Sequence, residues 1–148
     1  MQAQRESYSE NGYLLVERLI PADMVALLNA VTAGFIVQSR AERRSGTTFD
    51  LAPGHSAERP IVRRLKRPDE QHTLYWEFAT GLVADVVGPD VGFHHSKLNF
   101  EWHDGGDEVK RHQDIQFYPH TNYSPLTVGL SLRDTGMDDR PLMATAPG

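Results

Sequence analysis

The chain has no cysteine among its 148 residues. This absence excludes a disulfide framework, zinc or iron-sulfur sites held by thiolates, and catalysis by a thiol nucleophile. Any metal ion that this chain binds must therefore be held by histidine and by the carboxylates of aspartate and glutamate.

The chain is also poor in positive charge and in long apolar runs. It has 15 Lys and Arg against 20 Asp and Glu, a formal net charge of -5. Nucleic-acid binding depends on clustered Lys and Arg, so neither DNA nor RNA is an expected partner. No apolar run approaches the roughly 20 residues of a membrane span, and the polar residues 1–9 lack the apolar core of a signal peptide. We therefore expect a cytoplasmic protein without a membrane partner.

The first half of the chain carries helical patterns. Residues 12–20 are apolar and β-prone, and Pro21 follows where a helix can begin, which predicts a short strand and then a helix. Apolar residues recur at spacings of three and four over residues 22–40, the pattern of an amphipathic packing helix. A second such pattern covers residues 72–87 and is stopped by Gly88-Pro89.

Between Arg43 and Gln71 the periodicity fails, and the segment is basic and interrupted by prolines. We predict a long irregular connection here. Loops of this length are usually functional covers or disordered. A basic loop either receives an anionic group of a substrate or is simply solvated, and we favour the second alternative.

After Pro89 the period changes from about 3.6 to 2, which indicates strands over residues 91–102, 111–117 and 125–132. In each strand one parity is apolar, whereas the other is polar or small. The polar parity carries His95, Lys97, Asn99, Glu101, His112, Asp114, Gln116 and Thr127.

Helices followed by strands are typical of an α+β domain or of a β-barrel with helical decoration. We predict a single domain over residues 1–148, helical over 1–88 and β over 89–148. Because polar side chains cover one face of two strands, that face fits the lining of a site better than an ordinary core. A sandwich or barrel whose interior is a site explains this pattern.

Five of the seven histidines lie between residues 94 and 120. Most are expected to be ordinary exposed or hydrogen-bonded imidazoles. His112 and Asp114 differ because residues two apart on a strand point to the same side, roughly 6.6 Å apart at the backbone. An imidazole and a carboxylate in this arrangement suit iron, manganese or zinc, although a simple His–Asp hydrogen bond is the alternative.

Several motifs resemble the phytanoyl-CoA dioxygenase family. They are His112-Gln113-Asp114, Tyr118-Pro119-His120, residues 126–132, Pro141-Leu142, Pro147-Gly148, and Asn11-Gly12-Tyr13-Leu14-Leu15-Val16 before a Pro-started helix. The resemblance covers nearly the whole chain. It implies an oxygenase that depends on Fe(II), 2-oxoglutarate and O2, and a mainly β fold with N-terminal helices, the double-stranded β-helix or cupin-like jelly-roll barrel.

Carried over residue by residue, the resemblance implies that His112 and Asp114 are two of the three iron ligands. Asn99 matches a position that contacts 2-oxoglutarate, and Lys97 and Thr127 are further candidates for the same pocket. The Asp114 carboxylate favours hydroxylation, since a small residue there would open a site for halide.

Three of these side chains have two interpretations each. Lys97 pairs either with a ligand carboxylate or with Glu101, four residues along the same strand face. Gln116 either orients a ligand or substrate, or fills the barrel. Tyr118 either lines the mouth of the site and contacts substrate or packs, and packing is favoured.

The family's third iron ligand, a histidine, and its 2-oxoglutarate-binding arginine would follow Gly148. Ala146-Pro147-Gly148 resembles the start of the family's Pro-Gly-Ser-His turn, cut off before the serine. Within the chain, His95 is the best-placed substitute ligand. We therefore expect an N-terminal portion of a larger barrel, incomplete and inactive by itself.

The parent protein is expected to be a dioxygenase that hydroxylates a small organic substrate. The alternatives are a cupin-like, metal-dependent isomerase or hydrolase and a ligand-binding barrel without catalytic activity. The sequence leaves the oligomeric state open.

Overall fold

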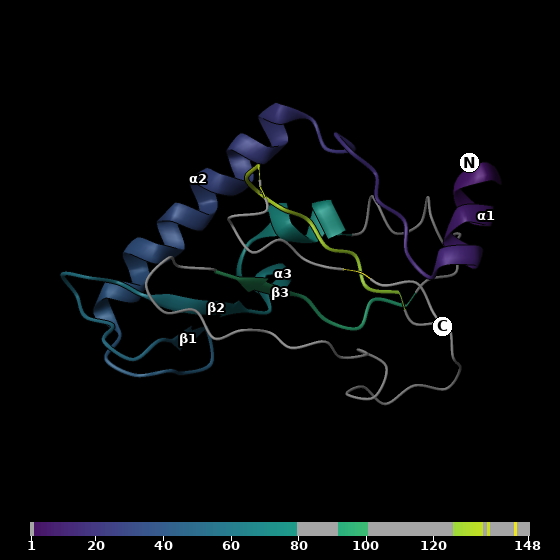
Figure 1. The fold of residues 1–148 in the computed structure, drawn as a ribbon. Coiled ribbons are helices and arrows are strands. Elements are labelled where there is room, and N and C mark those ends of the chain that lie inside the picture. Colours follow the sequence, from purple (N-terminus) through teal and green to yellow (C-terminus); the bar gives the residue numbers. More distant parts are fainter. Residues whose placement is uncertain (1, 80–91, 101–125, 135, 137–143, 145–148) are drawn as a thin grey trace.

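Helix α2 (Ala22–Gln38) dominates the computed structural model, which describes residues 2–79, 92–100, 126–134, 136 and 144 (Figure 1). Pro21 precedes the helix in an extended conformation, and Asp23 lies in its first turn, where a carboxylate interacts favourably with the helix dipole. The helix continues into the 3-10 turn η1 (Ser39–Ala41). The predicted packing helix over residues 22–40 is confirmed.

Three strands form an antiparallel sheet in the order β1 (Phe49–Leu51), β2 (Val62–Lys66), β3 (Lys97–Asn99). Leu65 of the central strand pairs with Phe49 on one side and with Leu98 on the other. Directly opposed residues point to the same face of a sheet. The register therefore collects these apolar side chains on one face.

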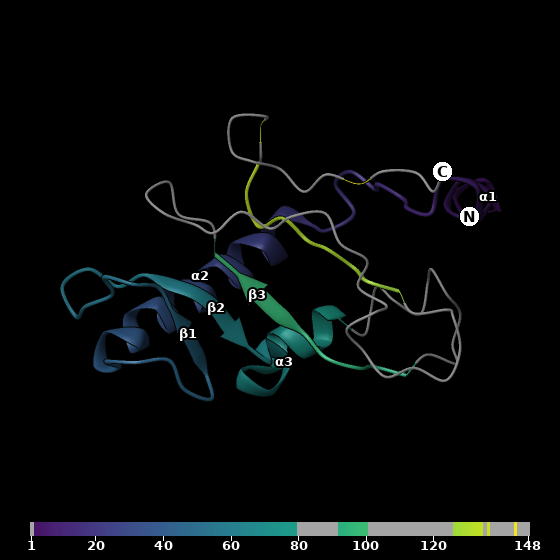
Figure 2. The ribbon, with the colours of Figure 1, turned by 60° about the horizontal axis from the view of Figure 1, so that its bottom comes forward.

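Helix α2 covers that apolar face, and Figure 2 shows the three strands side by side with α2 behind them. The ring of Phe35 on α2 lies 6.4 Å from the rings of both Phe49 and Tyr75. The buried hydrophobic core consists of Leu28, Phe35, Phe49, Val62, Leu65 and Tyr75. Full burial of one such side chain is worth about 1.5–3 kcal/mol, so this layer is the main stabilising contact of the described part.

A buried hydrogen bond joins α2 to the helical residues 73–79. Thr32 Oγ1 donates to the carbonyl oxygen of Leu28 at 2.6 Å, and it lies 2.7 Å from the hydroxyl of Tyr75. Because the Thr32 hydrogen is already used, the Tyr75 hydroxyl is the donor of the second bond. Burial raises the pKa of Tyr75.

The N-terminal region differs from the prediction. Helix α1 (Gln2–Asn11) forms where no element is predicted, and residues 12–20, predicted as a strand, contain none. Gly12 and Arg18 have positive φ values of 74° and 54°, which interrupt extended backbone. The apolar residues of this segment are not enough to form a strand, because a strand also needs a hydrogen-bonded neighbour.

The connection over residues 43–71, predicted to be irregular, contains β1, β2 and helix α3 (Pro68–Gln71). The prediction is wrong because these strands lack a clear period. The register of β1 shifts between Asp50 and Leu51, and β2 has two consecutive exposed residues between buried ones. Both strands also fall in the half of the chain predicted to be helical. The single domain over residues 1–148 stays a prediction.

The parity predicted for residues 91–102 is confirmed where the structure describes them. Leu98 and Phe100 pack against the core, whereas the side chains of Lys97 and Asn99 are exposed. The strand itself is shorter than predicted, because residues 92–96 precede β3 without strand structure.

Residues 126–132, predicted as a strand with residue 125, form no strand. Their apolar parity is nevertheless used, since Leu130 and Leu132 pack against the core. The Asn29 side chain on α2 donates a hydrogen bond to the Leu132 carbonyl oxygen at 2.9 Å. The segment is therefore held by the helix instead of by a neighbouring strand.

Residues 73–79 are helical, in agreement with the helix predicted over 72–87, and the rest of that helix lies outside the described residues. The strand predicted over 111–117 also lies outside them.

The stretch Ala22–Ala41 is long and apolar enough to cross a membrane by length and composition, with a mean hydropathy of 1.3. The prediction that no apolar run approaches the length of a membrane span is therefore wrong for this stretch. The helix buries Leu28, Thr32 and Phe35 in the core, and core helices of folded domains meet the same criterion. Packing against the sheet accounts for its apolar character.

We predict that Leu65→Ala lowers the free energy of unfolding by about 2–5 kcal/mol, because it leaves a cavity in the central strand. Leu65 is 0% exposed, whereas Leu27 on the outer side of α2 is 55% exposed and provides the control. Leu27→Ala should change stability by only about 0.5 kcal/mol. Urea unfolding followed by circular dichroism measures both, and equal losses would contradict this description of the core.

A second prediction concerns the pH dependence of stability. The unfolded chain ionises its tyrosine near the ordinary pKa of 10.0, whereas the folded protein holds Tyr75 protonated to higher pH. The contribution of Tyr75 to the free energy of unfolding should therefore be constant below that pKa and decrease as the pH rises above it. Unfolding of wild type and Tyr75→Phe from about pH 8 to about pH 11 measures it. Parallel curves for the two proteins would refute the expected loss in the wild type.

Candidate metal and cosubstrate site

The structure describes Lys97, Asn99 and Thr127 of the predicted site. The other predicted site residues lie outside the described residues, and their roles stay predictions: His112, Asp114, Gln116 and Tyr118. The geometry of the site is therefore built from β3 and the strand beside it.

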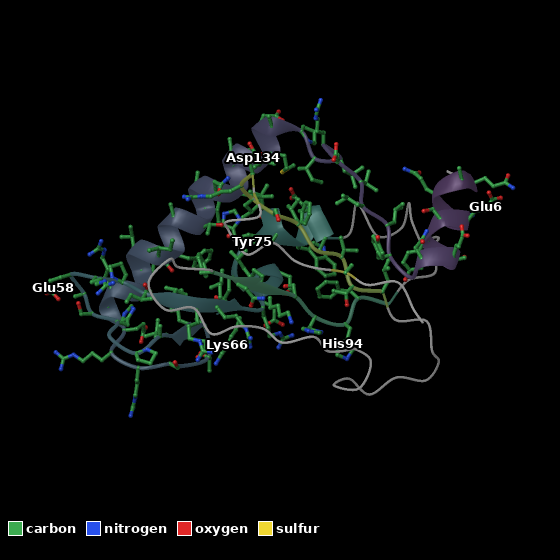
Figure 3. All side chains as sticks on the ribbon, in the orientation of Figure 1. Glu6, Glu58, Lys66, Tyr75, His94 and Asp134 are labelled. Carbon is green, nitrogen blue, oxygen red and sulfur yellow. The ribbon has the colours of Figure 1, made fainter. Side chains whose placement is uncertain are left out.

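Lys97 and Asn99 belong to a polar face of the sheet. Their cross-strand partners on β2 are Lys66 and Arg64, and Asp50 of β1 is opposite Arg64. We call these five residues the polar sheet face. Figure 3 shows Lys66 on the side of the sheet away from Tyr75 and α2. The polar sheet face is thus the opposite surface of the sheet that carries the core.

Hydrogen bonds orient the side chains of this face. Arg64 Nε donates to Asn99 Oδ1 at 3.1 Å, and Lys66 Nζ donates to the Gly46 carbonyl oxygen at 2.9 Å. The Asp50 carboxylate accepts a hydrogen bond from the Ser45 hydroxyl at 3.2 Å. Because Arg64 uses the amide oxygen of Asn99, the part of Asn99 that can serve a ligand is its amide nitrogen, a donor.

Two of the three described candidates therefore share one face, and the third does not lie on the sheet. Thr127 is exposed in residues 126–134, which form no ladder with β3. Its suggested contact with 2-oxoglutarate stays a prediction.

His95, the suggested substitute metal ligand, interacts with its neighbour His94. The Nδ1 atoms of the two rings are 2.7 Å apart, and the rings meet edge to face at 4.9 Å. One of these nitrogens donates the hydrogen bond and the other accepts it. Among the residues that the structure describes, no three His, Asp or Glu side chains come together as a metal site.

Arg64 and Lys66 belong to the basic segment predicted to be an irregular connection that either receives an anionic group or is solvated, with solvation favoured. The structure places both in the central strand, directly opposite the predicted cosubstrate residues. A signal was present in the sequence: the β-prone Val62 and the apolar Leu65 stand between prolines, which commonly bound strands.

A hollow of about 440 Å³ lies between η1 and the loop 55–58. Arg40 donates hydrogen bonds across it to the carbonyl oxygens of Ala57 and Glu58. Hydrogen bonds from the Glu58 backbone amide and the Ser56 hydroxyl lower the pKa of the Glu58 carboxyl, to which Arg40 also contributes. These groups bind one another, so the hollow is a joint between helix and loop.

His55 reinforces this joint. Its Nδ1 accepts a hydrogen bond from the Ile61 backbone N–H at 2.9 Å, which leaves Nε2 as the protonated nitrogen. Nε2 donates to the Ser39 carbonyl oxygen at 3.0 Å. The imidazole is fully used in holding the loop before β2, so His55 has a structural role.

Residues 8–143 match the phytanoyl-CoA dioxygenase (PhyH) family, and the chain belongs to it. The predicted resemblance is confirmed. Members of this family are Fe(II)- and 2-oxoglutarate-dependent dioxygenases with a cupin-like jelly-roll fold, which is the class and the set of cofactors that the sequence resemblance implies. The described residues form a three-stranded antiparallel sheet with helices.

The chain is similar to the probable alpha-ketoglutarate-dependent hypophosphite dioxygenase of Stutzerimonas stutzeri. The two are 27% identical over 154 residues, which cover 98% of this chain and 52% of the relative. The chain thus spans about half the length of that relative. No solved structure matches the chain at a significant level.

Proposed function

We propose that the protein carrying this chain is an Fe(II)- and 2-oxoglutarate-dependent dioxygenase that oxidises a small molecule. The main support for this activity is the family match over residues 8–143, a range that includes His112-Gln113-Asp114. The alpha-ketoglutarate dependence in the name of the relative supports the same activity.

His112 and Asp114 are the proposed iron ligands. The donor set fits the ion, because a neutral imidazole and a carboxylate suit Fe(II) and the chain has no thiolate to compete for it. Bound iron supplies the redox chemistry that couples oxidation of 2-oxoglutarate to oxidation of the substrate. On the proposed strand the two side chains, two residues apart, would point to the same side.

Lys97 and Asn99 are the proposed contacts of 2-oxoglutarate. Both lie on β3 with exposed side chains, and pairing with β2 holds their backbone in place. The Lys97 ammonium and the Asn99 amide nitrogen are donors, which suits a carboxylate. Thr127 adds a hydroxyl to the proposed pocket, and Gln116 and Tyr118 are proposed to contact the substrate.

For the whole protein we propose the jelly-roll barrel as the fold, with the sheet of β1, β2 and β3 as part of its wall. Helix α2 would cover the outside, and the polar sheet face would line the interior. The alternation of buried and exposed side chains on β3 supports this arrangement.

The substrate is proposed to be a small anion. The relative is named for hypophosphite, a small oxyanion, and the polar sheet face of this chain is rich in positive charge. Hydroxylation of an organic molecule and a cytoplasmic location both stay predictions.

The test is succinate release by the full-length protein supplied with Fe(II), 2-oxoglutarate and O2. His112→Ala and Asp114→Ala should each reduce iron affinity and turnover by more than about 100-fold, since loss of residues that only support a ligand already costs about 10–100-fold. Turnover that survives His112→Ala would exclude the proposed ligand.

The matched control is His72→Asn. His72 is exposed, and its Nδ1 accepts a hydrogen bond from the Leu74 backbone N–H at 3.2 Å, which asparagine can replace. This variant should keep wild-type turnover and iron affinity. An equal loss in the control would attribute the effect to general damage instead of to iron binding.

A further inference from the structure

We infer that Arg64 and Lys66 on the polar sheet face form the subsite for the anionic group of the substrate, beside the 2-oxoglutarate contacts Lys97 and Asn99. The ligand chemistry is that of an oxyanion or a carboxylate. The assignment to the substrate rests on the proposed oxygenase function, whereas the anion site itself does not.

The first argument is the arrangement of charge. Lys66 and Lys97 are direct cross-strand partners, and Arg64 lies on the same face two residues from Lys66. Like charges at opposed positions, where Cβ atoms are about 4.5–5.5 Å apart, destabilise a sheet. Asp50 is the single acid among the five residues of the face. A bound anion removes the repulsion between Lys66 and Lys97. Anion binding therefore explains why the two cations are placed opposite each other.

The second argument is that the core prevents the charges from moving apart. Leu65 stands between Arg64 and Lys66 in the sequence and is 0% exposed on the opposite face. A register slip of one residue would place Leu65 in the position of the cations and bury a charge. The packing of Leu65 therefore offsets the repulsion between the like charges. Local conflicts of this kind concentrate at functional sites.

The third argument is the supply of hydrogen-bond donors. Arg64 uses Nε on Asn99, so its two terminal nitrogens are left for a ligand, in the fork that matches an oxyanion. Lys66 uses one donor on the Gly46 carbonyl oxygen and has two more. Lys97 forms no ion pair within the part of the chain that the structure describes. The face thus offers oriented donors in excess of its own acceptors.

These contacts assign the two ligands to different strands, 2-oxoglutarate to β3 and the substrate to β2. On β3, Asn99 matches a position that contacts 2-oxoglutarate in the family, and Lys97 is a further proposed contact in the same pocket. On β2, Arg64 and Lys66 add two positive charges beyond that of Lys97, which a single carboxylate of 2-oxoglutarate bound at β3 can pair with. The three cations and the Asp50 carboxylate give the face a net charge of +2, which two singly charged groups balance: one carboxylate of 2-oxoglutarate and one anionic group of the substrate.

The binding experiment uses the protein without iron or 2-oxoglutarate, titrated with sodium hypophosphite and separately with acetate. Saturable ¹⁵N NMR shifts should occur at the Arg64 Nε–H group and at the amides of residues 64–66. Arg64→Gln and Lys66→Gln should each weaken binding about tenfold, as expected for the loss of a charged hydrogen bond. Arg64→Lys keeps the charge and should bind better than Arg64→Gln.

The matched control is Arg44→Gln, which removes the same charge from an exposed loop residue. It should bind both anions as the wild type does. Methyl signals of Val62 and Leu65 report whether each variant is folded. Absence of shifts at residues 64–66 with either anion, or equal weakening in Arg44→Gln, would overturn the inference.

Competition distinguishes the two sources of the anion. Saturating 2-oxoglutarate should leave the dissociation constant of hypophosphite unchanged. In the iron-loaded full-length protein, Lys66→Gln should raise KM for hypophosphite and leave KM for 2-oxoglutarate as it is. Displacement of hypophosphite by 2-oxoglutarate, or a raised KM for 2-oxoglutarate alone, would assign β2 to the cosubstrate and refute the substrate subsite.

The two proposals fail separately. Binding is measured without turnover, so a protein that releases no succinate but shows the expected shifts refutes the oxygenase and keeps the anion site. A protein that releases succinate but shows no shift at residues 64–66 keeps the oxygenase and refutes the subsite.

Discussion

The burial of Leu65 in the central strand is the constraint on which the described structure depends. Leu65 is paired with Phe49 and Leu98, and α2 closes over the same apolar face. Because side chains alternate along a strand, this packing also holds Arg64 and Lys66 on the opposite face. The hydrophobic core and the charged face are two consequences of one register.

The strand register therefore connects the stability of the core with the binding chemistry of the polar sheet face. The family to which the chain belongs uses 2-oxoglutarate, a dianion, and the polar sheet face combines positive charge with oriented donors. A strand whose other side is buried is a rigid support for such groups, and rigid supports lower the cost of binding because little has to be ordered. The opposed pair Lys66 and Lys97 fits the proposal that this face binds an anion.

Sequence patterns predicted those features that are encoded locally. The period of 3.6 identified α2, the parity of residues 97–100 was right, and the motif around His112 and Asp114 led to the family. Patterns failed for β1 and β2, because strands of three and five residues with a register shift show no regular period. They also failed for residues 12–20, where Tyr13, Leu15 and Leu19 are exposed, and for residues 126–132, where Leu130 and Leu132 pack against the core without strand pairing.

The sequence by itself determined the family, the packing helix and the kind of metal ligand available, since periodicity, motifs and the lack of cysteine are local properties. Only the tertiary structure decided that Arg64 contacts Asn99 across 35 residues of chain, and that Lys66 opposes Lys97. Strand register is set by which apolar side chains share a core, and that choice depends on Phe49, Leu65 and Leu98 together.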